Sequence, residues 1–414
     1  MTPPAPTPIL FTHYGDPWIR GSERLLLDLL ARLDRQRVRP VVWCNAVEMA
    51  DAVRGLGITT YRSDFEIYFD YLAPRFRPGH YRSLLREAHQ LIREHKIRVL
   101  HSNSAAPCQW LAPVARRERL PLLAHLHIGY LRRSRYVFLL HQASLVVGVS
   151  RQVVEPFLDD GLAADRIDVI YNGIDFARLH RQTDDDPRRR LGIAQDAIVI
   201  AAIGSLIQRK GQDVLIRAFG RLDPTRNIQL LIVSDGPERQ KLEQLTAELG
   251  LQTRIRFLGY YDDLAGVYAA ANIVALASRA DAFGLVLAEA GYFALPVVAT
   301  AIGGIPEVVE DGVTGLLVRA DDPPALAAAL ARLIDDRRLR EQLGRAGKQR
   351  VERLFGVDRM VANFHETYDR LERLPRHRLG WLDAVAGLKP YLRLIGAGRR
   401  QPPAPAAADT IRQQ

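Results

Sequence analysis

Short apolar segments that alternate with amphipathic, helix-periodic segments constrain this chain more than any other feature of its sequence. The apolar segments do not alternate internally with polar residues, which is the pattern of parallel strands buried on both faces. Strands and helices in alternation predict doubly wound parallel sheets. The first series of predicted strands comprises residues 8–13, 38–44, 97–102, 121–127, 145–150 and 167–171.

A polar stretch at residues 184–190 interrupts this pattern, and a second, similar series of strands follows it. That series comprises residues 197–204, 228–234, 254–258, 273–278, 296–300 and 315–318. A chain of 414 residues is also too long for one ordinary hydrophobic core. We therefore predict an α/β protein with two Rossmann-like doubly wound parallel-sheet domains at 1–185 and 186–357, and a basic, partly disordered tail at 375–414.

The net charge of +10 at pH 7 leaves three classes of partner open: nucleic acid, an anionic membrane surface, or a phosphorylated small molecule. The sequence has no helix-turn-helix, finger motif or aromatic stacking platform, so we expect no nucleic-acid partner. It has no uninterrupted apolar run of about 18 residues, so we expect no membrane-spanning helix. Peripheral contact of the basic tail with an anionic membrane stays open, with an ordinary solvated surface as the alternative.

The cysteines and the first residues bear on location. Cys44 and Cys108 are too few for a disulfide scaffold and suit a reducing compartment. The first residues lack the basic and then apolar pattern of a signal peptide. No Cys/His spacing resembles a zinc site, so no metal site is predicted. We expect a cytoplasmic protein, and a location at the inner face of the cell membrane stays open.

Ligands of open α/β sheets bind beyond the carboxyl ends of the strands, and unusual polar residues follow several predicted strands here. After the strand at 273–278 come Asp281, in a loop, and Glu289, in the helix that follows. Two carboxylates suit a ligand rich in hydroxyl groups, because each oxygen can accept a hydrogen bond. The alternative is an aspartate that caps the helix and a solvated glutamate.

The strand at 197–204 leads into a segment with glycines and two cations, Gly204-Ser-Leu-Ile-Gln-Arg209-Lys210-Gly211. Glycines allow the backbone to approach a ligand closely. Arg209 and Lys210 offer two cations to a diphosphate, and such cations can replace a metal in neutralising a departing diphosphate. The alternative is a glycine turn with exposed charges.

Gly303 and Gly304 follow the strand at 296–300, and Pro306 is suited to the first turn of a helix. Free N–H groups and the helix dipole make such a helix start an anion site. The alternative is a simple turn from strand to helix.

Two further candidates lie in the first domain. Segment 19–23 contains Gly21 and links the first strand to the first helix, so this glycine and the helix start could face the same diphosphate. His125 and His127 end the strand at 121–127, where one of them could stand at the reacting centre. The alternative for each histidine is a structural role.

Together these segments resemble the retaining glycosyltransferases of the GT-B group, family 4 (glycosyl transferases group 1), over roughly residues 7–372. The most specific parts are the segment 278–290, then Lys210-Gly211, then Gly303-Gly304-Ile-Pro-Glu307, with support from 149–150 and 169–175. The resemblance implies a GT-B fold whose two domains face a central cleft. It also implies a last helix, near 358–374, that packs back on the first domain.

The resemblance assigns roles to residues of this chain. Asp281 would contact the donor sugar and Glu289 the ribose of the nucleotide, while Arg209 and Lys210 would hold the diphosphate. His127 matches the family's first-domain histidine better than His125 does, so the predicted catalytic residues are His127, Lys210 and Asp281. The implied donor-binding set is Gly21, Arg209, Lys210, Asp281, Phe283, Gly284, Leu285, Glu289, Gly303 and Gly304.

The chain departs from the family pattern at four positions. The first carboxylate of the motif is usually Glu and is Asp281 here, and the residue after it is Ala282 in place of Gly. Ser205 stands where an arginine often follows the phosphate-strand glycine, and Arg20 replaces one of two adjacent glycines in the first domain. No required charge is lost, and the contacts to the sugar stay open.

The predicted function is retaining transfer of a sugar from a nucleotide diphosphate sugar to a hydroxyl of a glycan or lipid-linked acceptor. By resemblance, it belongs to polysaccharide or glycolipid biosynthesis. The donor substrate is the only small molecule required, with no further cofactor and no metal. The alternatives are a sugar-nucleotide epimerase or a phosphorylase on the same fold, and a binding protein with a degenerate site.

Overall fold

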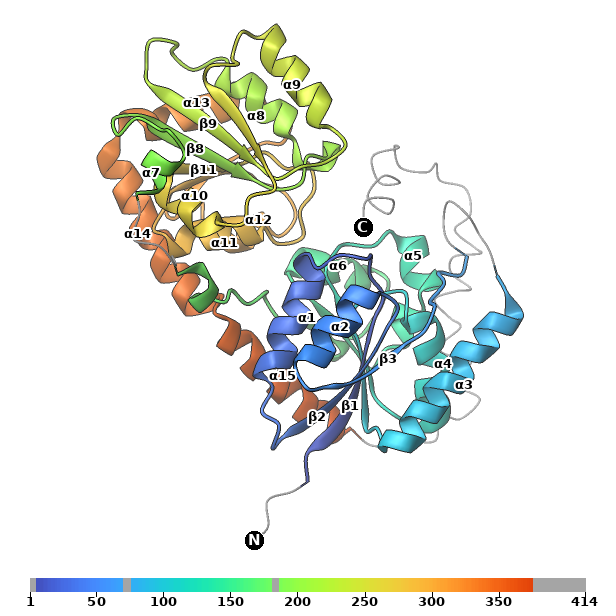
Figure 1. The fold of residues 1–414 in the computed structure, drawn as a ribbon. Helices are drawn as coiled ribbons and strands as arrows, with labels where there is room; N and C mark the ends of the chain where they lie inside the picture. Colours follow the sequence, from blue (N-terminus) through green and yellow to red (C-terminus); the bar gives the residue numbers. More distant parts are fainter. Residues whose placement is uncertain (1–4, 70–75, 181–185, 375–414) are drawn as a thin grey trace. The chain divides into compact units, whose positions relative to one another are not determined.

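The structure, a computed structural model, describes residues 5–69, 76–180 and 186–374 (Figure 1). The chain forms two compact units, one of Met1–Tyr171 with Met360–Gln414 and one of Asn172–Arg359. The division after Tyr171 falls earlier along the chain than residue 185, where the sequence places the join. The tail expected at 375–414 lies outside the described residues.

The first unit contains a seven-stranded sheet in the order β3-β2-β1-β4-β5-β6-β7. All of its neighbouring strands are parallel, as the continuous apolar segments predict. The strand order reverses between β1 and β4, which is the point where open α/β sheets bind ligands. The strands are β1 (Thr7–His13), β2 (Val38–Cys44), β3 (Thr59–Arg62), β4 (Val99–Ser102), β5 (Leu122–Leu126), β6 (Leu145–Gly148) and β7 (Ile167–Val169).

Helices cover both faces of this sheet, and Figure 1 shows α1 and α2 on one side with α3 and α4 on the other. The helices are α1 (Gly21–Arg32), α2 (Val47–Gly55), α3 (Pro78–His95), α4 (Cys108–Glu118), α5 (Arg132–Val137) and α6 (Arg151–Asp159), with 3-10 turns η1 (Leu140–Gln142) and η2 (Ala164–Arg166). The last helix, α15 (Val357–Glu372), supplies the buried side chains Phe364 and Tyr368 to this unit. The hydroxyl of Tyr368 lies 2.8 Å from Nδ1 of His101 in β4.

The second unit repeats the architecture with a six-stranded parallel sheet, in the order β10-β9-β8-β11-β12-β13. Its order reverses between β8 and β11. The strands are β8 (Ile198–Ile203), β9 (Ile228–Val233), β10 (Ile255–Gly259), β11 (Ile273–Leu276), β12 (Val297–Thr300) and β13 (Gly315–Val318). The helices are α7 (Pro187–Arg190), α8 (Gln212–Phe219), α9 (Arg239–Glu248), α10 (Leu264–Ala270), α11 (Leu285–Tyr292), α12 (Ile305–Val308), α13 (Pro323–Asp335) and α14 (Arg337–Leu354), with 3-10 turns η3 (Ala177–Leu179) and η4 (Gln208–Lys210).

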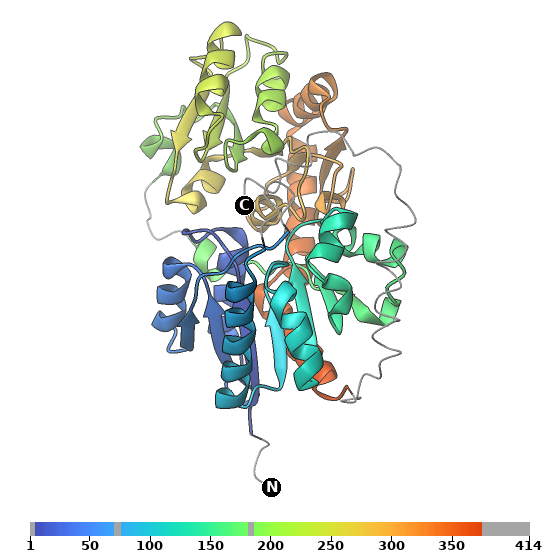
Figure 2. The same cartoon turned by 90° about the vertical axis from the view of Figure 1, so that its right-hand side faces the viewer.

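Figure 2 shows the sheets and helices of the two units from a second direction. The core of each unit consists of buried apolar side chains between the sheet and its helices. In the second unit, β8 and β9 pack their buried aliphatic side chains against Leu215 and Phe219 of α8. The sequence pattern missed one strand, β3, because this short edge strand carries exposed and half-buried residues instead of an apolar run. No helix among the described residues is long and apolar enough to cross a membrane.

Candidate functional site

Three loops of the second unit meet at the carboxyl ends of neighbouring strands. They follow β8, β11 and β12, which are adjacent in the sheet on either side of the point where its order reverses. The fold therefore brings together the three segments that the sequence singles out in this unit.

Lys210 and Asp281 form the centre of this cluster. Nζ of Lys210, at the end of η4, lies 2.6 Å from Oδ2 of Asp281. The other carboxylate oxygen of Asp281 accepts from the backbone N–H of Phe283 at 3.3 Å and of Gly284 at 3.0 Å. Asp281 thus binds the backbone just before α11, but it does not cap this helix, which has no side-chain cap. It also contacts the lysine that the functional interpretation requires.

The surroundings of Asp281 keep it ionised. Burial alone would raise the pKa of this carboxyl, but the Lys210 ammonium, the nearby Arg209 and the N–H of Phe283 hold the pKa below its usual value. Lys210 keeps further donor capacity, because an ammonium group has three N–H donors and Asp281 occupies one of them.

Gly303 and Gly304 pack directly on the backbone of Asp281. The N–H of Gly304 donates to the carbonyl of Asp281 at 3.1 Å. Gly303 has φ of +55°, and a Cβ at this position would lie 1.8 Å from the same carbonyl oxygen. Only glycine fits both the backbone conformation and this close approach. The two glycines therefore position Asp281, a role that the sequence alone did not indicate.

Arg209 and Arg279 join the loop after β8 to the loop after β11. Arg209 donates to the carbonyl of Ala280 at 2.8 Å. Arg279 donates to both carboxylate oxygens of Asp213 at 2.8 Å and to Asp321 at 2.7 Å. Sequence reasoning overlooked Arg279, although it lies two residues before Asp281. Its charge resembles that of any surface arginine until the fold places Asp213 opposite it.

Glu289 lies in α11 beside a buried tyrosine, and it is not the solvated glutamate of the alternative interpretation. The hydroxyl of Tyr268 donates to Oε2 of Glu289 at 2.6 Å. Burial raises the pKa of Glu289, and the Tyr268 hydroxyl and Arg178 oppose that rise. Burial and the nearby carboxylate also raise the pKa of Tyr268 well above its usual value, so the tyrosine stays a donor. No signal in the sequence marks Tyr268, which lies in an ordinary apolar stretch of α10.

Three predicted donor-binding residues between the two carboxylates lead into α11. Phe283 is buried against the edge of Phe355, with ring centroids 5.4 Å apart. Gly284 is the residue before the helix and has φ of +88°, which favours glycine. Leu285 is the first helical residue and is half-buried. Phe283 therefore serves packing, while Gly284 lets the chain turn so that its N–H reaches Asp281.

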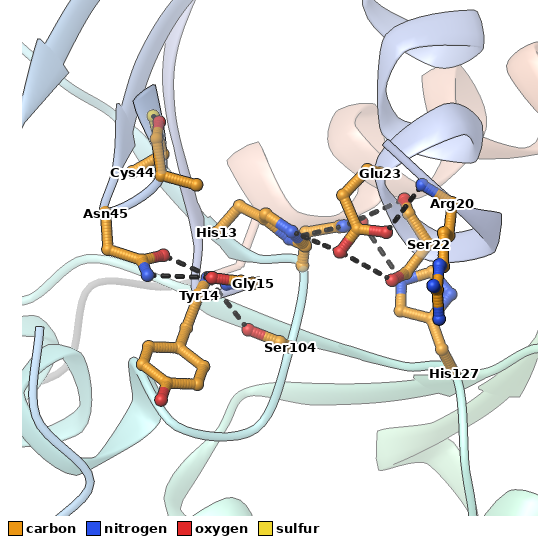
Figure 3. A network of polar contacts seen from close by, with 12 residues as sticks. His13, Tyr14, Gly15, Arg20, Ser22, Glu23, Cys44, Asn45, Ser104 and His127 are labelled. Atoms are coloured by element: carbon orange, nitrogen blue, oxygen red, sulfur yellow. Dashed lines mark hydrogen bonds and ion pairs between the residues drawn. The ribbon is translucent and has the colours of Figure 1, made fainter. Parts of the chain in front are cut away.

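The first unit has a polar network of its own at the carboxyl ends of β1, β4 and β5 (Figure 3). Nε2 of His13 lies 3.0 Å from Oε1 of Glu23, in the first turn of α1. The side-chain amide nitrogen of Asn103 lies 3.0 Å from Nδ1 of His13. The amide oxygen of Asn103 lies 3.2 Å from Nδ1 of His125 and 3.2 Å from Nε2 of His127. We call these five residues the histidine network.

The histidine network contains one predicted catalytic residue, His127, and its neighbour His125. His127 is the first residue after β5 and is half-buried, whereas His125 is buried within the strand. The predicted Gly21 is the exposed first residue of α1, two residues before Glu23. Sequence reasoning missed the other three members, although His13 and Asn103 carry the signal it used elsewhere, a polar residue at the end of a strand.

Gly15 is a further residue that the sequence did not reveal. It lies against the His13–Glu23 contact, and a Cβ there would come within 2.5 Å of His13 Nε2 and 2.7 Å of Glu23 Oε1. Both backbone groups of Gly15 bond to the side-chain amide of Asn45, at 2.9 Å and 2.8 Å (Figure 3). A residue without a side chain therefore lets the loop pass over the network.

The structure contains no group of three or more His, Cys, Asp or Glu side chains that could hold a metal ion, among the residues it describes. The two cysteines, Cys44 and Cys108, are buried and unpaired with each other. Burial raises the pKa of Cys44 to about 11 and that of Cys108 to about 12, so neither is a reactive thiolate.

Comparisons with known proteins cover both units. Residues 19–178 match the family described as Glycosyltransferase Family 4, and residues 183–350 match Glycosyl transferases group 1. The chain is 38% identical over 231 residues to D-inositol 3-phosphate glycosyltransferase of Salinispora tropica, across 51% of this chain and 47% of that protein. It therefore spans about half the length of this relative. It is 27% identical over 281 residues to N-acetyl-alpha-D-glucosaminyl L-malate synthase of Bacillus anthracis, across 65% of this chain and 74% of that protein.

A solved structure agrees with these matches. The HepE protein of Anabaena in complex with UDP is 25% identical to this chain, with a TM-score of 0.75 over 87% of this chain and 99% of that one. The two parallel sheets, the two family matches and the HepE structure point to the same group. The chain belongs to the family 4 glycosyltransferases, glycosyl transferases group 1, of the GT-B fold.

Proposed function

We propose that this protein transfers a sugar from a nucleotide diphosphate sugar to an acceptor hydroxyl, with retention of the anomeric configuration. The observation that carries the proposal is the cluster at the carboxyl ends of β8, β11 and β12. There, Lys210 and Arg209 lie beside the ionised Asp281, and two glycines support the aspartate. UDP is the first nucleotide to test, because it is the ligand named for the HepE complex.

Each member of the cluster has a chemical task in this proposal. Negative charge builds on the diphosphate as the bond to the sugar breaks, and Lys210 and Arg209 stabilise that charge. These two cations do the work of a metal ion. Asp281 accepts hydrogen bonds from sugar hydroxyls, and Glu289, held by Tyr268, accepts them from the ribose. The acceptor hydroxyl attacks on the face from which the diphosphate departs.

The proposed acceptor is a glycan or lipid-linked molecule that carries negative charge, in polysaccharide or glycolipid biosynthesis. The net charge of +10 supports this, and the names of the two relatives refer to inositol phosphate and malate, which are both anions. We propose a cytoplasmic location with peripheral contact at anionic membrane. Co-sedimentation with anionic vesicles that is unchanged after deletion of residues 375–414 would show that the tail does not make this contact.

The decisive experiment measures binding of UDP, GDP, ADP and their sugar forms by titration calorimetry, on the wild type and on Glu289→Gln. We expect one nucleotide diphosphate and its sugar form to bind. Glu289→Gln should bind them at least about tenfold more weakly, because one accepting carboxylate oxygen is replaced by an NH2 donor and the charge is lost. Glu248→Gln, at an exposed position in α9, is the matched control and should bind as the wild type does. Equal affinities for all three proteins would place the nucleotide elsewhere.

Product analysis separates transfer from the alternatives on the same fold. A transferase releases the nucleotide diphosphate only as an acceptor gains the sugar, and NMR of the product gives its anomeric configuration. An epimerase converts the sugar nucleotide without an acceptor, and a phosphorylase requires inorganic phosphate. A protein that binds the donor and does none of these is the degenerate binding protein.

A further inference from the structure

We propose that Glu23 fixes the tautomer of His127 through His13 and Asn103, so that these three residues are positioning residues for a neutral histidine with a free Nδ1 lone pair. The relay follows from the geometry of the histidine network. Its consequence for catalysis rests on the proposed function.

The relay begins at the carboxylate of Glu23. An ionised carboxylate has no proton to donate, so it only accepts hydrogen bonds. Oε1 of Glu23 lies 3.0 Å from Nε2 of His13, so this nitrogen carries the proton. Burial alone would raise the pKa of Glu23, but the hydrogen bond from His13, the electrostatic interaction with that ring, and the hydrogen bonds from its own backbone and from Ser22 lower that pKa to about 2. The carboxylate is therefore ionised across the physiological range. A neutral His13 with its proton on Nε2 has a lone pair on Nδ1.

The second step passes through the amide of Asn103, which has a donor end and an acceptor end. The lone pair on Nδ1 of His13 accepts from the amide nitrogen of Asn103 at 3.0 Å. The amide oxygen then faces Nδ1 of His125 and Nε2 of His127, each at 3.2 Å. An oxygen only accepts, so both of these ring nitrogens carry protons.

Two backbone groups support this arrangement, and one of them bears on its direction. The carbonyl of Ser22, which only accepts, lies 3.5 Å from the amide nitrogen of Asn103, so a reversed amide would turn an oxygen toward it. The backbone N–H of Arg20 donates to Oε2 of Glu23 at 3.3 Å, which holds the carboxylate in place. The reversed relay, with a proton on Nδ1 of His13, conflicts with the Ser22 carbonyl.

His127 is left with its proton on Nε2 and its lone pair on Nδ1. That Nδ1 atom is buried and has no hydrogen-bond partner among the described residues, and the same is true of Nε2 of His125. Burial, together with the neighbouring histidines, lowers the pKa of His127 well below its usual value, so the ring is neutral. An unmatched buried acceptor is costly, and a donor supplied by a ligand removes that cost. A sugar hydroxyl is such a donor.

The test reads the tautomers directly, without any need for activity. The full chain is labelled with ¹⁵N-histidine, and long-range ¹H–¹⁵N spectra distinguish the Nδ1–H, Nε2–H and doubly protonated rings. Loss of a signal in His13→Gln, His125→Gln and His127→Gln assigns the three rings. We expect neutral rings at pH 7.5, with the proton on Nε2 in His13 and His127 and on Nδ1 in His125. A proton on Nδ1 of His127, or a charged His13, would overturn the relay.

The variant Asn103→Leu removes the amide at nearly constant volume, and Gln109→Leu is the matched control. Gln109 is a buried amide of the same unit with three hydrogen bonds of its own, outside the histidine network. We expect Asn103→Leu to give mixed tautomers at His125 and His127, and Gln109→Leu to leave them as in the wild type. Unchanged tautomers in Asn103→Leu would overturn the proposal even if stability falls.

Activity then tests the consequence. Asn103→Leu should lower kcat/KM at least about tenfold while UDP binding to the second unit is retained, since the cluster around Asp281 is untouched. Wild-type protein with the expected tautomers but without nucleotide binding would refute the proposed function and leave the relay intact. Full activity in Asn103→Leu, in spite of mixed tautomers at His125 and His127, would refute the role of the relay in catalysis.

Discussion

Replacement of Gly303 by alanine tests whether the glycines position Asp281. The new Cβ would lie 1.8 Å from the carbonyl oxygen of Asp281, so the two must separate by more than about 1 Å before ordinary contact is restored. The positive φ of Gly303 adds a backbone penalty of ~1–2 kcal/mol for any residue with a Cβ. Forced displacement in a packed region costs a further ~1–3 kcal/mol.

The control is Gly312→Ala, because Gly312 has φ of +72° and a Cβ added there would have no neighbouring atom within 4 Å. It shares the backbone penalty and lacks the collision. Urea unfolding should therefore show a loss of ~1–2 kcal/mol for Gly312→Ala and about twice as much for Gly303→Ala. The displaced Asp281 should also lower kcat/KM by ~10²-fold in Gly303→Ala alone. Equal stabilities and equal activities for the two variants would refute the positioning argument.

The remaining predictions concern charge. Lys210→Ala should lower kcat/KM by ~10²–10³, measured as diphosphate release, and a variant with more than half the wild-type activity would contradict its role. Wild-type activity should persist in EDTA, and complete loss that magnesium restores would show that the two cations do not suffice. Arg279→Lys should lower kcat/KM roughly tenfold, because lysine cannot bond both oxygens of Asp213 as a planar guanidinium does, and an unchanged kcat/KM would argue against this. In the folded protein the pKa of Glu23 is about 2, below its usual 4.5. The ionised carboxylate therefore stabilises the fold by up to ~3 kcal/mol. This stabilisation is present in full above pH 4.5 and is lost as the pH falls toward 2. In Glu23→Gln the free energy of unfolding should depend less on pH in that window. A pH dependence as steep as that of the wild type would contradict this prediction.

The sequence predicts the two sheets well because every buried parallel strand carries a continuous apolar run. The strands β2 and β13 begin and end where the pattern places them, and the other predicted strands differ by one or two residues at an end. The exception, β3, pairs only at the sheet edge and needs no apolar face, so its sequence shows no such run.

Only part of the candidate site was predictable from the sequence, namely the residues whose charge is unusual at their position. Lys210, Asp281 and Glu289 carry unusual charges in recognisable positions, so they are visible in the sequence. The residues that hold them in place are not. Tyr268 looks like any buried tyrosine, and Arg279 like any surface arginine, until the fold brings Glu289 and Asp213 beside them. Positioning depends on contacts between distant segments, and those contacts exist only after folding.

The return of α15 to the first unit has a consequence for the order in which the protein is made. During synthesis, residues 1–171 leave the ribosome long before Phe364 and Tyr368, whose rings pack against His101 and Phe11. Until α15 emerges, that apolar surface stays uncovered and is open to wrong associations. The second unit is one continuous stretch, Asn172–Arg359, and can finish folding as soon as it emerges. The half of the protein that is synthesised first is therefore the last to be completed.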